Sequence, residues 1–313
     1  MKSFFSRIGN NEAVAGYLFI LPNLLGFLVF TSLPVLASLA LSFLSWDVLT
    51  PPKFVGFANF VNLLGFHKEA GNLVANDPLF WKYLYNTVFF LLNVPICMVG
   101  SLLVALLMNK KLRGITIYRT IFFLPSICAG VAVCFLWRWI LNPDFGLINI
   151  FLMRVFELFH INTLPPEWLC SITWAKPALM LMGFWGGIGG MNMILYLAAL
   201  QNVPKELYEA AEIDGANSWR KFWTVTVPFI SPTTFFITIM SIIGGFQGGF
   251  MQAYIMTGGG PAGSTTTIEY YIYNNAYQWF KMGYASSIAW FLFVIIFIIT
   301  LINWRFSGKF VHY

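Results

Sequence analysis

Charged side chains are scarce in this chain of 313 residues, at 10% of the total, whereas soluble domains carry about 25%. No Lys, Arg, Asp or Glu occurs between Lys221 and Glu269, and none occurs within the other long apolar tracts. Proton relays and ion-coupled carriers keep acids, bases or histidines inside their membrane-spanning helices. The sequence therefore argues against energy coupling by protonation within this chain.

Cysteine and histidine are also few. The cysteines include no close pair of the kind that binds zinc or forms a redox motif, and lie at Cys97, Cys128, Cys134 and Cys170. The histidines are scattered, at His67, His160 and His312. The phosphate loop Gly-x-x-x-x-Gly-Lys-Ser/Thr does not occur. We therefore expect no catalytic residue, metal site or bound cofactor in this chain, and ATP and Mg, where they are used, in a separate subunit.

Long apolar runs are what the sequence has in abundance, since 58% of its residues are hydrophobic. A helix needs about 20 mostly apolar residues to span a bilayer. Continuous apolar runs favour helices, because barrel strands alternate apolar and polar residues. Six tracts reach the required length: Ala13–Trp46, Leu84–Asn109, Thr120–Trp137, Pro177–Gln201, Thr224–Ile268 and Met282–Trp304. The sequence predicts an all-α integral membrane protein with six spans, the fifth tract holding one span and then a loop.

The distribution of Lys and Arg predicts the orientation of the spans, because cytoplasmic loops carry an excess of these residues. With both termini cytoplasmic, the inner side holds eleven Lys and Arg against five acids, and the outer side holds seven of each. The whole positive excess then lies on one side of the membrane. This distribution explains the net positive charge of the chain without a nucleic-acid partner. We expect the spans to be surrounded by membrane lipid.

The tracts divide the chain into four predicted regions. Residues 1–46 form a cytoplasmic tail and the first span, residues 47–83 an extracytoplasmic segment, residues 84–304 a five-helix core with a cytoplasmic loop at 202–228, and residues 305–313 a second cytoplasmic tail. A further outer segment, Arg138–Lys176, separates the third and fourth spans. Glycines crowd the fourth and fifth spans, where they serve either close helix packing or irregular backbone that lines a cavity.

The cytoplasmic loop predicts two short helices. Pro204 suits a helix start, and Leu207, Ala210, Ala211 and Asp214 share one face from Lys205 onward. Gly215 suits the residue just after a helix end. Asn217 or Ser218 can cap a second short helix, after which Pro228 begins the fifth span. We expect a compact knob at the membrane surface.

The same loop resembles the coupling motif of permease subunits of type I bacterial ABC importers. That motif is Glu-Ala-Ala, three residues, Gly, nine residues, then two alternate aliphatic residues and Pro. Here its positions are Glu209, Ala210, Ala211, Gly215, Val225, Val227 and Pro228. The two valines replace the usual Ile and Leu and keep an apolar face.

Other segments resemble the carbohydrate-uptake branch, which includes maltose and glycerol-phosphate permeases. They are Tyr17–Pro22, Ser32–Pro34, Gly56–Phe60, Asn86–Thr87, Met256–Pro261, Tyr271–Tyr273, Ala276–Tyr277 and Gly283–Ser286. The resemblance implies an import subunit of the bacterial inner membrane that does no chemistry itself. It implies a second homologous permease, two ATP-binding subunits and an extracytoplasmic solute-binding protein as partners.

The resemblance also implies roles for particular residues. Contact with the ATPase would fall to Glu209, Ala210, Ala211, Asp214, Gly215 and Pro228. Because the cargo path in this family runs between the helices that flank the loop, aromatic and amide side chains there are candidates for sugar contact: Phe184, Trp185, Asn192, Phe246, Gln247, Phe250 and Gln252.

Several alternatives remain open at this level. The cargo is a sugar or oligosaccharide, neutral or acidic, or else a non-sugar solute such as an amino acid, peptide or anion. The outer segments either contact the binding protein or cover the pore. An autonomous secondary carrier is disfavoured by the loop motif and the lack of buried ionisable groups, and a membrane-embedded enzyme by the lack of catalytic groups in the spans.

Overall fold

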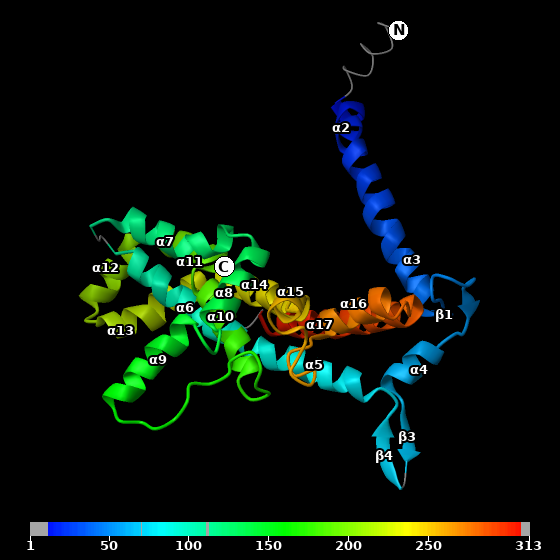
Figure 1. The fold of residues 1–313 in the computed structure, drawn as a ribbon. Coiled ribbons are helices and arrows are strands. Elements are labelled where there is room, and N and C mark those ends of the chain that lie inside the picture. Colours follow the sequence, from blue (N-terminus) through cyan, green and yellow to red (C-terminus); the bar gives the residue numbers. More distant parts are fainter. Residues whose placement is uncertain (1–11, 70, 111–112, 308–313) are drawn as a thin grey trace, which may run out of the picture. The chain divides into compact units, whose positions relative to one another are not determined.

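The computed structural model describes residues 12–69, 71–110 and 113–307 (Figure 1). The predicted terminal tails at 1–11 and 308–313 lie outside these residues. Within the described ranges, five helices are long and apolar enough to cross a membrane, and a bent pair raises the number to six. The long helices are Glu12–Ser42, Pro78–Met108, Ala175–Gln201, Ser218–Phe246 and Met282–Arg305. The predicted all-α membrane fold is confirmed.

The chain forms two compact units. The first comprises residues up to Asn76 together with Tyr273–Trp290, and the second comprises Asp77–Ile272 and the residues from Phe291 onward. The first unit begins with α2 (Glu12–Phe27), a π-helical turn Leu28–Ser32 and α3 (Leu33–Ser42), which form one helix. It ends in the π-helical turn Asn274–Gln278 and the first residues of α17 (Met282–Ser307).

The segment predicted to be extracytoplasmic, residues 47–83, holds regular structure between its turns. Strand β1 (Leu44–Ser45) pairs antiparallel with β2 (Lys53–Phe54), α4 (Ala58–Leu64) follows, and β3 (Phe66–Glu69) forms a hairpin with β4 (Asn72–Ala75). The buried Asn59 amide donates to the carbonyls of Ser42 and Leu44. This amide ties α4 to the end of the first span.

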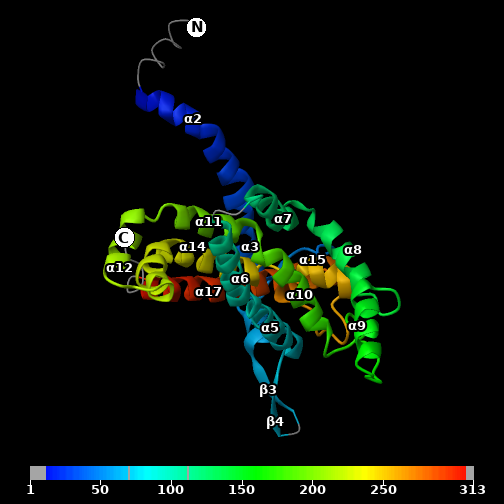
Figure 2. The same ribbon diagram turned by 90° about the vertical axis from the view of Figure 1, so that its left-hand side faces the viewer.

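The second unit contains the remaining spans. In chain order its helices are α5 (Pro78–Leu91), α6 (Asn93–Met108), α7 (Ile115–Ile127), α8 (Gly130–Ile140), α9 (Leu147–Leu158), α10 (Ala175–Ile188), α11 (Gly190–Gln201), α12 (Lys205–Ile213), α13 (Ser218–Lys221), α14 (Val227–Phe246), α15 (Phe250–Gln252) and α16 (Ile268–Tyr273). Helix α6 contacts α10 and α11, and α11 contacts α14 (Figures 1 and 2). Tyr196 and Met193 of α11 and Ile237 of α14 are almost fully buried in this core.

The third span departs from the prediction. The tract Thr120–Trp137 was expected to be one helix, but α7 and α8 meet at a bend of 99°. Cys128 and Ala129 between them have ψ angles of 139° and 125°, outside the helical range. Pro125 contributes to the break because it has no backbone N–H to donate to the preceding turn.

The second span begins earlier than predicted and is interrupted. Asp77 caps α5 by accepting a hydrogen bond from the Phe80 N–H, so the helix starts at Pro78 rather than Leu84. Leu92 separates α5 from α6. Pro95 cannot donate to the carbonyl four residues before it, which explains an interruption at this point.

A Gly-rich loop, residues 257–267, is fastened to α5 by buried polar side chains. The Asn86 amide donates to the carbonyls of Gly263 and Thr266, and the Thr87 hydroxyl accepts the Ile268 N–H. Thr266 in turn donates to the Gly259 carbonyl. The Asn86–Thr87 pair thereby holds this loop in a defined conformation.

Candidate functional site

The predicted cytoplasmic helix is present as α12, which begins directly after Pro204 and ends at Ile213. Gly215 follows with φ of +74°, in the left-handed region that glycine adopts most readily. The Ala216 N–H donates to the Ala211 carbonyl, which closes the helix end. The sequence prediction for this helix and its glycine is therefore confirmed.

Two side-chain contacts hold α12 against the helix that follows. The Tyr208 hydroxyl lies 2.9 Å from the Thr226 hydroxyl, and Lys221 forms an ion pair with Glu212. Thr226 is buried, and the Lys221 side chain is 19% exposed. Both contacts fix the position of α12 relative to α13 and the start of α14.

The second part of the loop differs from the prediction. Asn217 does cap α13 by accepting the Arg220 N–H, but α13 is not a separate short helix. It continues through a π-helical turn, Phe222–Thr226, into α14, so that one helical segment runs from Ser218 to Phe246. Pro228 lies inside this segment instead of beginning it. The proline is tolerated because it occupies the first turn of α14, directly after the π-helical turn.

Most of the motif residues on α12 and in the turn after it are exposed to solvent. Glu209, Ala210 and Asp214 are exposed, Ala211 and Pro228 are half-buried, and Ile213 is 88% exposed. Trp219, beside them on α13, is 70% exposed. An acidic helix with a small-residue face and exposed apolar side chains is a surface that suits a protein partner.

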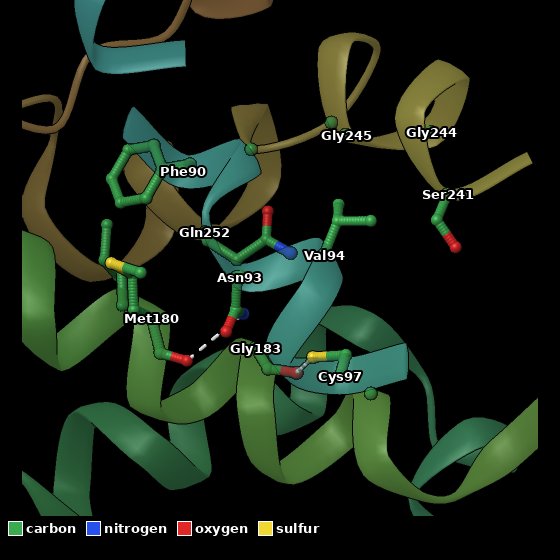
Figure 3. Close-up of a pocket in the computed structure, with 14 residues that line it drawn as sticks. Phe90, Asn93, Val94, Cys97, Met180, Gly183, Ser241, Gly244, Gly245 and Gln252 are labelled. Carbon is green, nitrogen blue, oxygen red and sulfur yellow. Dashed lines mark hydrogen bonds between the residues drawn. The ribbon is translucent and has the colours of Figure 1, made fainter. Parts of the chain in front are cut away.

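A cavity of about 420 Å³ lies within the second unit. It is bounded by the α5–α6 junction, α10, the end of α14 and α15, and its lining residues are Phe90, Asn93, Val94, Cys97, Leu179, Met180, Gly183, Gly187, Ser241, Gly244, Gly245, Gly248, Gly249 and Gln252. Figure 3 shows Gln252 reaching toward Asn93 and Val94. Most of the lining is apolar, with four polar side chains (Asn93, Cys97, Ser241 and Gln252), which is the usual character of a small-molecule site.

Glycines in the cavity wall allow the surrounding helices to pack closely. A side chain at Gly183 or Gly187 would collide with Asn93 or Cys97, and one at Gly245 would collide with Leu91. Gly249 has φ of +97° at the turn between α14 and α15. The glycine runs of the fourth and fifth spans thus serve both of the roles expected for them, close packing and an irregular cavity wall.

Of the seven residues proposed from the sequence for the cargo path, only Gln252 lines this cavity. Trp185 packs edge-on against Trp137, Phe246 is buried, and Phe250 contacts the rings of Tyr254 and Tyr270. Gln247 is exposed at the end of α14, and Phe184 and Asn192 are half-buried.

Sequence reasoning missed the contribution of the second span to the cavity. Asn93 donates to the Met180 carbonyl at 3.3 Å, and the Cys97 thiol lies 3.8 Å from the Gly183 carbonyl (Figure 3). A signal was available in the sequence. Asn93 is one of the few polar residues in the tract Leu84–Asn109 and precedes Pro95 by two residues, a combination that indicates an interruption of the spanning helix beside a cavity.

The chain matches a protein-family model and is similar in sequence to known proteins. The family model described as binding-protein-dependent transport system inner membrane component matches residues 70–308. The probable ABC transporter permease protein YesP of Bacillus subtilis (strain 168) is 39% identical over 98% of this chain and 95% of its own length. The lactose transport system permease protein LacF of Rhizobium radiobacter is 37% identical, covering 93% of each chain.

Two solved structures share the fold. A bacterial ABC transporter involved in the import of the acidic polysaccharide alginate contains a chain that is 23% identical, with a TM-score of 0.80 over 99% of this chain and 100% of its own. A bacterial alginate ABC transporter in complex with an alginate pentasaccharide-bound periplasmic protein gives 24% identity and a TM-score of 0.78, covering 94% and 93% of the two chains.

Proposed function

Because the chain belongs to the family of binding-protein-dependent transport system inner membrane components, we propose that it carries saccharides through the cavity of its second unit and receives the motion of an ATPase through α12. Membership makes the chain a permease subunit of an ABC importer, a transport protein and not an enzyme. The chain is therefore a multi-pass protein of the inner membrane that works with a solute-binding protein.

The names of its relatives support a carbohydrate as cargo. LacF belongs to a lactose transport system, and the arabinooligosaccharides transport permease AraP of Bacillus subtilis (strain 168) is 31% identical over 96% of this chain. The cavity supports the same class, because amide and hydroxyl groups set in an apolar wall suit the polar groups and carbon faces of a sugar ring.

The observation that carries the coupling proposal is the single helical segment from Ser218 to Phe246. At one end it is tied to α12 through Thr226 and Lys221. At its other end Ser241, Gly244 and Gly245 line the cavity. A helix of this length spans roughly 40 Å, so a displacement of α12 reaches the cavity wall as movement of one rigid element.

We assign the ATPase contact to the exposed face of α12 and its C-terminal turn. Glu209 offers the charge, Ala210 and Ala211 allow close approach, and Asp214 and Gly215 form the turn. Pro228 holds the start of α14. Two ATP-binding subunits, which would hold ATP and Mg, and a second permease complete the assembly. ATP binding and cargo binding are coupled because each favours a different conformation of the same assembly.

ATP hydrolysis by the complete importer in proteoliposomes tests this proposal. We expect saccharide-loaded binding protein to stimulate hydrolysis by the unmodified complex, and Glu209→Lys and Gly215→Asp to reduce that stimulation to the basal rate. Glu12→Lys serves as the control, since it reverses an exposed charge at the start of the first span, outside both the loop and the outer segments. Full stimulation in both loop variants would contradict the assignment.

A further inference from the structure

Two lysines lie at the outer end of the helices that line the cavity. Helices α5–α6 and α10 touch through successive contacts, Asn93 to Met180, Cys97 to Gly183, and Ser101 to Gly187. Lys176 continues this series outward, with its Nζ 4.8 Å from the ring centre of Tyr85 and 5.0 Å from that of Phe89. It lies one turn before Met180, which is about 6 Å along the helix axis.

Lys82 on α5 adds a second positive charge. Its ammonium donates to the Ala262 carbonyl in the Gly-rich loop, and it lies close enough to Lys176 for the two charges to repel each other. The ion pairs among the described residues are His67–Glu69 and Lys221–Glu212. Neither lysine at this end of the cavity therefore has a carboxylate partner within the part of the chain that the structure describes.

Two carboxylates adjoining α5, that of Asp77 at its start and that of Glu269 after the Ile268 N–H bonded to Thr87, have hydrogen-bond partners of their own. Asp77 accepts the Tyr271 hydroxyl at 2.7 Å and the Phe80 N–H, and Glu269 accepts the Phe250 N–H. Lys176 is half-buried against ring faces, and an ammonium group has three donors, of which a ring face satisfies few. Lys176 thus carries a partly desolvated positive charge about one helical turn from an apolar cavity that contains amide groups.

Building on the proposed import of saccharides, we propose that Lys176, assisted by Lys82, makes the path selective for saccharides whose sugar units carry a carboxylate. An anionic sugar approaching from the outer side meets two positive charges before it reaches Asn93 and Gln252. A neutral saccharide of the same size would gain only the contacts within the cavity. The preference for the anion therefore originates at the outer end, in side chains of α5 and α10.

Protection of Cys97 from alkylation tests this inference without relying on the choice made by the binding protein. Cys97 lines the cavity, so a bound saccharide shields it. The purified importer, with all its subunits, is treated with neutral iodoacetamide, and modification of Cys97 is measured by mass spectrometry. The two probes are trigalacturonate and its methyl ester, which match in size and differ in charge. Lys176→Gln removes the charge, Lys176→Arg keeps it, and Arg154→Gln removes an exposed charge from α9.

In the unmodified importer we expect the acid to protect Cys97 at concentrations at least about fivefold lower than the ester, the scale of one charge pair at contact in water. Lys176→Gln should abolish this difference, while Lys176→Arg and Arg154→Gln should retain it. A higher ionic strength should reduce it. Without saccharide, Cys97 should react at the same rate in every variant, which shows that the cavity is intact.

Equal protection by acid and ester, unchanged by Lys176→Gln, would overturn the role of the lysine and leave the cavity as the path. Absence of protection by either probe would overturn the cavity as the path as well. Neither result affects the ATPase experiment on α12, so failure of this inference and failure of the coupling proposal are distinguishable.

Discussion

Glu269 illustrates how one residue shapes the cavity without lining it. Its carboxylate accepts the Phe250 N–H at 3.0 Å, directly after Gly249, whose backbone belongs to the cavity wall. Burial raises the pKa of Glu269, and the hydrogen bond from Phe250 opposes this rise without cancelling it. The carboxylate thus fixes the turn between α14 and α15. Because burial disfavours its ionised form, the free energy that it contributes to folding depends on pH.

The sign of that dependence follows from the raised pKa. The folded protein binds this proton more tightly than the unfolded chain, so the contribution of Glu269 to stability is fully present below its ordinary pKa of 4.5 and is lost as the pH rises through the folded pKa. We expect Glu269→Gln to remove this loss, because glutamine still accepts the Phe250 N–H. The Tm of the variant should rise relative to that of the unmodified protein as the pH is raised above 4.5, as measured by tryptophan fluorescence in detergent. An equal dependence of Tm on pH in the two proteins would refute this.

At the scale of elements, the fourth span depends on one close approach between helices. Gly189 separates α10 from α11, and a Cβ built there would lie 1.9 Å from the Phe122 carbonyl oxygen of α7. Backbone atoms cannot move aside as a flexible side chain does. The position of α7 against the broken fourth span therefore requires glycine at this point.

Gly189→Ala should destabilise the protein by about 1–3 kcal/mol, the usual cost of overpacking. Gly186→Ala is the matched control, because nothing lies within 4 Å of a Cβ at that position. Alanine also favours the helix by about 1 kcal/mol over glycine. Thermal unfolding of both variants in the same detergent measures the contrast, and equal losses of stability would mean that α7 does not pack as described.

Sequence periodicity predicted the elements whose signals are local. The ends of α12, the glycine after it and the Asn217 cap all follow from residues within one turn of each other. The bend at Cys128 and the continuity of α13 with α14 did not follow, because proline marks a weak point without deciding whether the helix breaks there. Pro125 precedes a break of 99°, whereas Pro228 sits within one helical segment.

The cavity was predicted only in part for a similar reason. Glycine runs reveal where backbones approach, and they pointed correctly to α10 and the end of α14. The side chain that packs against a glycine comes from the neighbouring helix, and the glycine run itself does not identify that helix. Asn93 and Cys97 come from a span distant in sequence, so their place opposite Gly183 and Gly187 required the packed structure.

At the scale of the whole molecule, the bent pair α7–α8 decides the topology. If the pair crosses the membrane once, the chain has six spans, and the segment with Cys170 lies outside while α12 lies inside. If the pair instead turns back to the side it came from, every later segment changes sides. The positive charges favour six spans, because only that arrangement places Lys205, Arg220 and Lys221 in the cytoplasm with the N-terminal basic residues.

Labelling with a membrane-impermeant maleimide distinguishes these arrangements. Cys170 is exposed, so it should react in intact spheroplasts. A cysteine introduced by Lys205→Cys at the exposed start of α12, outside the residues assigned to the ATPase contact, should react only in inverted membrane vesicles. The opposite pattern would show that α7–α8 does not cross, and it would place α12 away from ATP, which also removes the basis for coupling. The expected pattern puts the exposed acidic face of α12 on the same side as ATP, as its contact with an ATP-binding subunit requires.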